Sequence, residues 1–166
     1  MRKIISIIVI GLIVVIGAGF AVREVVFPIK DKDIIEKYAK EYNVEPELVA
    51  SIINFETRFE PVKNTGKNGA GLMKLTADTG EKIAKEMGDT NFNKDDIDKD
   101  DTNIKLGTYY ISKNGGENLS DLVGNWAIRN GENKEDKFDD KQYAKDNYTK
   151  KIETRKDIYK VLYFLF

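Results

Sequence analysis

Apolar residues recur every three or four positions along most of the chain after residue 32, which is the period of an amphipathic α-helix. Proline and glycine interrupt this pattern: Pro46 suits the first turn of a helix, Pro61 lies just beyond a helix, and Gly88 closes another. No segment alternates with the period of a β-strand, so the sequence predicts an all-α domain. The predicted helices cover residues 33–42, 46–59, 76–87, 101–115, a segment that opens at 118 or 120, and 149–166.

Polar stretches separate these helices. Residues 61–71 hold several glycines and are predicted to form a loop, residues 91–101 an acidic connector, and residues 130–147 an irregular polar segment. The acidic connector starts like a calcium-binding loop, because aspartates alternate from residue 96. Its sixth position is Asp101 where a glycine is required, and its twelfth is Gly107 where a glutamate is required. We therefore predict a solvated, helix-capping loop and no metal site.

The first residues predict a membrane anchor. Residues 4–22 carry no charge and are rich in Ile and Val, and Arg2 and Lys3 precede them. A helix of about 20 apolar residues crosses a bilayer, and flanking positive charges stay in the cytoplasm. The prediction is a cytoplasmic N-terminus at residues 1–3, a single-pass anchor at 4–22 in the cell membrane, a tether at 23–31 and an extracytoplasmic domain at 32–166.

A cleaved signal peptide is the alternative for this segment. The small residues around Gly19-Phe20-Ala21 could form a cleavage site, and the domain would then be secreted. The apolar run is longer than the usual signal-peptide core of about 7–15 residues, which favours the anchor.

The composition limits the possible chemistry. The 166 residues include no cysteine and no histidine, and the formal net charge is −1. Disulfides, a thiol nucleophile, a histidine base and the commonest zinc sites are therefore excluded. No strong basic patch is present, so nucleic acid is not an expected partner. Acid–base chemistry is left to Asp, Glu, Lys or Tyr, and no cofactor is predicted.

Glu56 is the candidate for that chemistry. It falls in line with Val49, Ile52 and Ile53 on the apolar face of the second predicted helix, with Phe59 beyond it. A carboxyl group placed there loses water, which disfavours its charged form. A carboxylic acid that stays protonated near neutral pH is suited to general-acid catalysis. The alternative is a structural glutamate paired with a lysine.

Three motifs around this residue resemble a known family. Residues 56–61 read Glu-Thr-Arg-Phe-Glu-Pro, similar to Glu-Ser-x-Phe-x-Pro. Residues 71–74 read Gly-Leu-Met-Lys, similar to Gly-Leu-Met-Gln, and residues 103–110 match Asn-Ile-x-Leu-Gly-Thr-x-Tyr. In this order, over residues 31–128, they resemble the soluble-lytic-transglycosylase (SLT) domain of the lysozyme-like superfamily. The resemblance is greatest to short, membrane-anchored forms from Gram-positive bacteria.

The resemblance implies a lysozyme-like fold and a reaction. The substrate would be peptidoglycan, cut at the β-1,4 bond between N-acetylmuramic acid and N-acetylglucosamine without water and leaving a 1,6-anhydro end. Glu56 alone would serve as acid and base, whereas ordinary glycosidases use two carboxyl groups. The resemblance further implies these substrate-binding residues: Thr57, Thr65, Gly71, Leu72, Met73, Lys74, Tyr109 and Trp126.

The chain departs from the family pattern at several positions. Lys74 replaces the family's glutamine, and an ammonium near Glu56 would oppose its role as an acid. The family's Ala-Tyr-Asn-x-Gly should fall near residues 125–131, where Trp126 could supply the aromatic wall but no asparagine substitutes clearly. Near the C-terminus, the tyrosine expected after Glu153-Thr154 comes two places late, at Tyr159.

These departures leave two alternatives to an active lytic transglycosylase. One is a catalytically degenerate module that binds glycan without cutting it. The other is a muramidase that uses water, as goose-type lysozymes do. That reaction needs a second carboxylate, for which Asp78 or an acid of residues 95–101 could be proposed. The sequence does not indicate an oligomeric state.

Overall fold

The computed structural model describes residues 5–11, 13–14, 17, 19, 26–28, 30–66, 68–131 and 140–165. All regular structure in these residues is helical, which confirms the all-α prediction. The loop before α4 adds two isolated β-bridges, Val62 with Gly71 and Ala70 with Leu75. The helices are α2 (Lys32–Tyr42), α3 (Pro46–Thr57), α4 (Ala77–Glu86), the short 3-10 helix η1 (Lys94–Asp98), α5 (Asp100–Asn114), α6 (Leu119–Ala127) and α7 (Asp140–Leu165).

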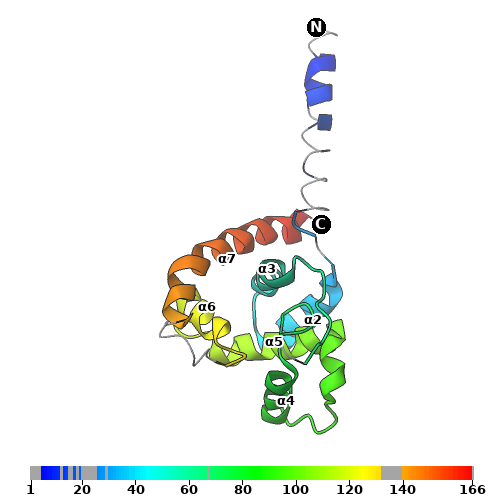
Figure 1. Ribbon diagram of the computed structural model, residues 1–166. Helices are drawn as coiled ribbons and strands as arrows, with labels where there is room; N and C mark the ends of the chain where they lie inside the picture. The colour runs from blue at the N-terminus through cyan, green and yellow to red at the C-terminus, as the bar shows by residue number, and fades with distance from the viewer. Residues whose placement is uncertain are drawn as a thin grey trace.

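Helix α3 lies in the middle of the domain, with α2, α5, α6 and α7 arranged around it (Figure 1). Every residue from Leu48 to Asn54 is buried, so α3 is covered on all sides rather than along one stripe. Its last turn carries Glu56, which is thereby held near the centre of the molecule. The end of α3 is set by Arg58 and Phe59, both in the left-handed region with φ of 55° and 63°. The helix therefore ends two residues before the predicted position, and Phe59 turns into the core.

Helix α7 overturns the prediction of an irregular segment at 140–147. It starts at Asp140, nine residues before the predicted start, whereas residues 132–139 lie outside the described part of the chain. Its first turns pack against α6, where Ala144 is fully buried and Lys145 pairs with Asp121 at 2.6 Å. Gly124 of α6 lets the two helices approach closely, since a Cβ there would lie 2.9 Å from Lys145. The local sequence is polar because only a narrow stripe of this helix is covered; tertiary packing decides its conformation.

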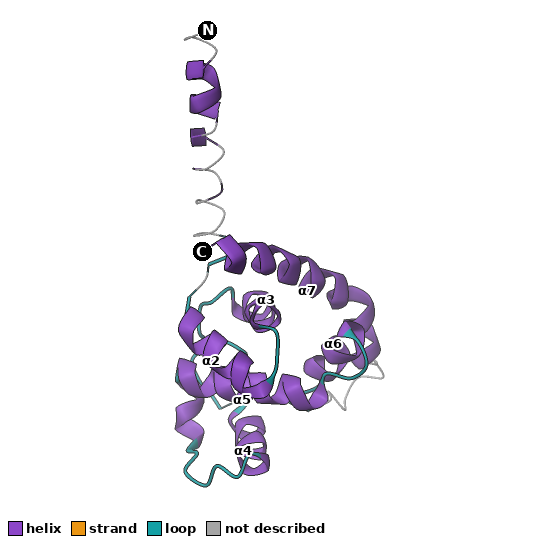
Figure 2. Ribbon diagram, turned by 180° about the vertical axis from the view of Figure 1, so that it is seen from behind, coloured by secondary structure: helices purple, strands orange, loops and turns teal. Residues whose placement is uncertain are grey.

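The remaining boundaries follow the predictions closely. Thr76 caps α4, with its side chain accepting a hydrogen bond from the Thr79 amide, and Asn118 caps α6 through the Asp121 amide. Helix α5 begins at Asp100, just before the predicted start. The acidic connector was predicted without regular structure but contains η1. Figure 2 shows this helical arrangement from behind.

The N-terminal segment stands away from the domain (Figure 1). Residues 5–11 are helical, and the isoleucine and valine side chains described there are exposed. No helix within the described residues has both the length and the apolar character needed to cross a membrane. Part of the predicted anchor at 4–22 lies outside the described residues, so the anchor stays a prediction.

The predicted tether is attached to the domain over residues 26–28. The Phe27 ring packs edge-on against Tyr159 at 5.8 Å between centroids. The Tyr159 hydroxyl donates to the Pro28 carbonyl, and Asn54 Nδ2 donates to the Val26 carbonyl. The domain therefore extends to Val26, and this stretch is not a free linker.

Candidate active site

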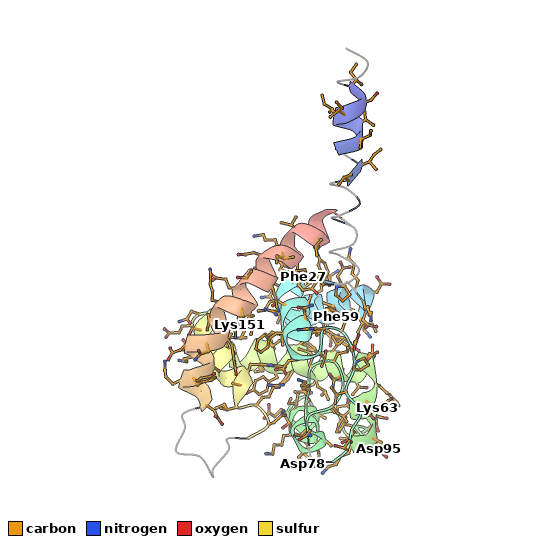
Figure 3. The ribbon with its side chains drawn as sticks, turned by 45° about the horizontal axis from the view of Figure 1, so that its top comes forward. Phe27, Phe59, Lys63, Asp78, Asp95 and Lys151 are labelled. Atoms are coloured by element: carbon orange, nitrogen blue, oxygen red, sulfur yellow. The ribbon has the colours of Figure 1, made fainter. Side chains whose placement is uncertain are left out.

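A pocket of about 530 Å³ opens beside the end of α3. Its walls come from segments far apart in the sequence: the last turn of α3, the loop before α4, helix α6 with the turn that follows it, and the middle of α7. Lys151, on α7, is labelled in Figure 3. The lining residues are Phe55, Glu56, Lys74, Val123, Trp126, Ala127, Arg129, Tyr148, Lys151 and Ile152.

Glu56 lines this pocket with its side chain 12 % exposed. Its Oε1 accepts hydrogen bonds from Trp126 Nε1 at 2.8 Å and from an Arg129 guanidinium nitrogen at 3.0 Å. Lys74 Nζ lies 3.8 Å from Oε2, beyond hydrogen-bond distance. Glu56 is therefore paired with cations and still borders an open cavity. This arrangement combines the two interpretations of the sequence, the buried acid and the paired glutamate.

Arg129 holds several parts of the site together. Its side chain is 6 % exposed and its guanidinium lies 4.1 Å from the centre of the Trp126 ring. Besides Glu56, it donates to the carbonyls of Met73, Lys74 and Trp126 at 2.8–3.1 Å. Burial lowers the pKa of Arg129, and the Glu56 carboxylate opposes that shift. Arginine remains charged in proteins, so the pocket keeps a fixed positive charge behind Glu56.

The loop that carries Lys74 has an unusual backbone. Lys74 adopts the left-handed conformation with φ of 46°, which costs free energy in a residue with a side chain. Its carbonyl accepts hydrogen bonds from Arg129 and from Asn130 Nδ2, the latter at 2.8 Å. Asn130 in turn accepts a hydrogen bond from the Thr76 amide at 3.0 Å. These contacts keep Lys74 at the pocket.

The side chain of Asn103 binds the backbone of this loop. Its fully buried side chain accepts a 2.7 Å hydrogen bond from the Met73 amide and donates to the carbonyls of Ala70 and Ile97. Gly71 packs directly on it, since a Cβ at Gly71 would lie 2.2 Å from Asn103 Nδ2. The Gly-Leu-Met and Asn-Ile motifs thus meet in one structural unit behind Glu56.

Comparison with known proteins identifies the family to which the chain belongs. The model of the transglycosylase SLT domain family matches residues 33–150. The chain belongs to this family. The prediction of a lytic transglycosylase-type enzyme is thereby confirmed at the level of the family, while the short, membrane-anchored Gram-positive subtype stays a prediction.

The fold of the SLT domain is similar to a solved structure, the X-ray structure of an inactive mutant of lytic transglycosylase Slt from Pseudomonas aeruginosa. The TM-score is 0.59 and the sequence identity 16 %, over 78 % of this chain and 23 % of that chain. The chain thus spans less than a quarter of that enzyme's length. Among curated proteins, no match is found.

Of the substrate-binding residues predicted from the sequence, Lys74 and Trp126 line the pocket with Glu56. Leu72 and Met73 are buried in the core, and Gly71 is buried beside Asn103, so these three shape the loop without lining the cavity.

The other three predicted residues lie elsewhere. Thr57 Oγ1 donates to the Leu72 carbonyl at 2.8 Å and ties α3 to the loop. Thr65 is exposed on the loop and does not line the pocket. Tyr109 packs edge-on against Tyr42, with ring centres 5.5 Å apart, also outside the pocket. None of the three lines the pocket, so their roles in substrate binding stay predictions.

Seven residues that line the pocket were not predicted as site residues from the sequence: Phe55, Val123, Ala127, Arg129, Tyr148, Lys151 and Ile152. The Phe55 and Tyr148 rings form a tilted pair with centres 5.2 Å apart, and both line the pocket. Tyr148 lies next to the segment predicted as irregular, so its helical neighbours could not be inferred. Arg129 could have been predicted, because it falls in the stretch where the family motif was expected.

The SLT domain provides no second carboxylate beside Glu56 within the described residues. Glu56 is the only acidic residue among those that line the pocket. Asp78 pairs with Lys94 at 2.6 Å, and Asp98 accepts a hydrogen bond from the Asn64 amide. Neither Asp78 nor any acid of residues 95–101, the sources proposed for the water-using alternative, lines the pocket. No group of acidic residues in the described part of the chain could hold a metal ion either.

Proposed function

We propose that this protein is a peptidoglycan lytic transglycosylase that cleaves the bond between N-acetylmuramic acid and N-acetylglucosamine, with Glu56 as its single acid and base. The observation that carries the proposal is the geometry of Glu56. It borders a pocket large enough for a sugar, two donors hold its Oε1, and no other carboxylate among the described residues lines the cavity.

The chemistry needs only one carboxyl group. Protonated Glu56 gives its proton to the glycosidic oxygen as the bond from that oxygen to C1 of the muramic acid breaks. The 6-hydroxyl of the same sugar attacks C1 and forms the 1,6-anhydro bond. The Glu56 carboxylate takes up the hydroxyl proton, which restores the acid for the next cycle. No water is consumed.

The two cations beside Glu56 have different freedom to move. Arg129 is buried and bound to three carbonyls, so it stays in place and stabilises the carboxylate formed after proton donation. The Lys74 side chain is 42 % exposed and has a long contact to Oε2. A bound sugar can therefore displace the Lys74 ammonium from Oε2.

We also propose that the domain works outside the cell, held by an uncleaved anchor at residues 4–22. The charge-free run, the positive residues before it and the exposed apolar side chains of residues 5–10 support this placement. Secretion after signal cleavage is the alternative, and the mass of the protein recovered from membranes distinguishes the two.

A glycan-binding module without turnover is the second candidate, because Lys74 lies beside the acid where the family has glutamine. If this candidate function is correct, the unmodified chain binds glycan strands without cleaving them, and Lys74→Gln restores cleavage.

The experiment is digestion of purified peptidoglycan by the full chain in detergent, with products identified by mass spectrometry. We expect 1,6-anhydro ends, their loss in Glu56→Gln, and no effect of Glu60→Gln, which makes the same change at an exposed residue one turn on. The related Pseudomonas structure is of an inactive mutant in which glutamine likewise replaces a glutamate. Anhydro products that persist in Glu56→Gln would disprove the assignment, and reducing ends would indicate hydrolysis.

A further inference from the structure

The pocket carries an excess of positive charge. Among its lining residues, Lys74, Arg129 and Lys151 are cationic and only Glu56 is anionic. The chain as a whole has a formal net charge of −1, so the excess is a local feature of the pocket. Arg129 and Glu56 form the closest pair, at 3.0 Å, and neutralise each other. The excess charge therefore belongs to Lys74 and Lys151.

Lys151 has no carboxylate partner among the described residues. Its ammonium lies 5.3 Å from the centre of the Tyr148 ring. The neighbouring lysine on α7, Lys150, is paired with Glu153 at 2.8 Å, and Lys156 is paired with Glu45. Lys151 thus differs from these lysines of the same helix by lining a cavity without a counterion.

Lys74 lines the same pocket from the loop before α4. Glu56 is a weak partner for the Lys74 ammonium. Lys74 Nζ lies 3.8 Å from Glu56 Oε2, too far for a hydrogen bond, and Arg129 already neutralises the carboxylate. The backbone of Lys74 is held by the contacts of its carbonyl to Arg129 and Asn130, while its side chain is 42 % exposed. The pocket is therefore lined by two ammonium-bearing side chains, one from the loop before α4 and one from α7.

Part of the wall of the pocket is apolar and aromatic. Phe55 and Tyr148 form a tilted pair with ring centres 5.2 Å apart, and both line the pocket. Aromatic faces suit the apolar face of a sugar, while ammonium groups suit an anionic substituent on it. In peptidoglycan, the anionic groups near the scissile bond are carboxylates carried by the muramic acid.

We propose that Lys74 and Lys151 bind a carboxylate carried by the muramic acid next to the scissile bond, so that the enzyme selects anionic over amidated glycan strands. This inference rests on the proposed function and adds its substrate preference. The carboxylate has two possible sources: the lactyl group of a strand without peptide, or the peptide stem. Both present the same chemistry to the pocket.

Binding of glycan strands to the pocket can be measured through Trp126. It is the single tryptophan of the chain and lines the pocket, so its fluorescence reports occupancy without cleavage. The full-length Glu56→Gln chain in detergent is titrated with peptide-free strands and with stem-bearing strands, each with free or amidated carboxylates. We expect amidation to raise the Kd up to about five-fold, the scale of a partly exposed charge pair. The strand type that responds identifies the source of the carboxylate.

Matched variants test the assignment to Lys151. Lys151→Gln should remove the difference between free and amidated strands, Lys151→Arg should keep it, and Lys150→Gln, at an exposed neighbour, should leave it unchanged. The preference should also weaken at high salt. Equal affinity for both strands, or equal weakening of both by Lys151→Gln, overturns the inference.

A failure of this inference can be distinguished from a failure of the proposed function. If Glu56-dependent anhydro products form and carboxylate amidation has no effect, the inference fails alone. If no anhydro products form, the proposed function fails, and the fluorescence titration still decides whether the pocket selects carboxylates.

Discussion

The indole Nε1 of Trp126 donates a 2.8 Å hydrogen bond to Oε1 of Glu56, across 70 residues of sequence. The contact links α6 to the last turn of α3 at the point where the pocket opens. An indole N–H can only donate, so it binds the carboxylate without competing for its proton. Together with Arg129, it binds one oxygen of Glu56, whereas the other lies 3.8 Å from Lys74 Nζ.

Trp126→Phe should lower kcat on the order of ten-fold, because it removes a hydrogen bond to a charged group while keeping an aromatic ring. Steady-state kinetics on defined glycan strands measures this. Tyr110→Phe is the control: its hydroxyl donates to the Asn125 carbonyl, and its ring packs on Trp126 without reaching Glu56. An equal loss in both variants would mean that Trp126 acts only through packing.

Arg129→Lys should lower the free energy of unfolding by about 2–4 kcal/mol, because an ammonium cannot replace a planar guanidinium that bonds Glu56 and three carbonyls. Urea denaturation followed by circular dichroism measures it. The same substitution at exposed Arg58 should change stability by less than about 0.5 kcal/mol. Wild-type stability in Arg129→Lys would show that the network is dispensable.

Gly71→Ala should be far more harmful than Gly66→Ala. Both glycines have a positive φ, 70° and 77°, so both substitutions carry a similar backbone cost of about 1 kcal/mol. Only at Gly71 does the new methyl meet another group, the buried Asn103 amide at 2.2 Å, whereas nothing lies within 4 Å at Gly66. We expect the melting temperature to fall clearly further for Gly71→Ala; equal shifts would contradict the packing of loop on Asn103.

Asp100→Asn should stabilise the protein at neutral pH. Burial raises the pKa of Asp100, and the negative charge of Asp31 raises it further, while Lys63 opposes the shift. A carboxyl group whose folded pKa is raised contributes most when protonated, and this contribution is lost as pH rises through the folded pKa. The gain in Asp100→Asn should therefore be present at pH 7, below about 1 kcal/mol in size, and absent below about pH 4.

Urea titrations at several pH values measure this gain. Asp95→Asn, at an exposed position on η1, is the control and should give no comparable gain. A gain that grows toward low pH would have the wrong sign and would exclude burial as the cause.

Much of the fold could be predicted because it depends on local patterns. The caps at Thr76 and Asn118, the proline at the start of α3 and the helical spacing of α2 to α6 are all properties of neighbouring residues. Helix α7 could not be predicted over its first turns, because their polar sequence becomes helical through packing on α6. Thr65 and Tyr109 were predicted from the family resemblance alone, and neither lines the pocket.

The sequence by itself determined that the domain is helical and made Glu56 the candidate acid. Only the tertiary structure decided what surrounds that carboxyl group. Arg129, Trp126, Lys74 and Lys151 reach the pocket from three separate segments. Hydrogen bonds and ion pairs act over a few ångströms of space, whereas sequence patterns inform only on residues within a few turns, so the partners of Glu56 were fixed by the packing of α3, α6 and α7.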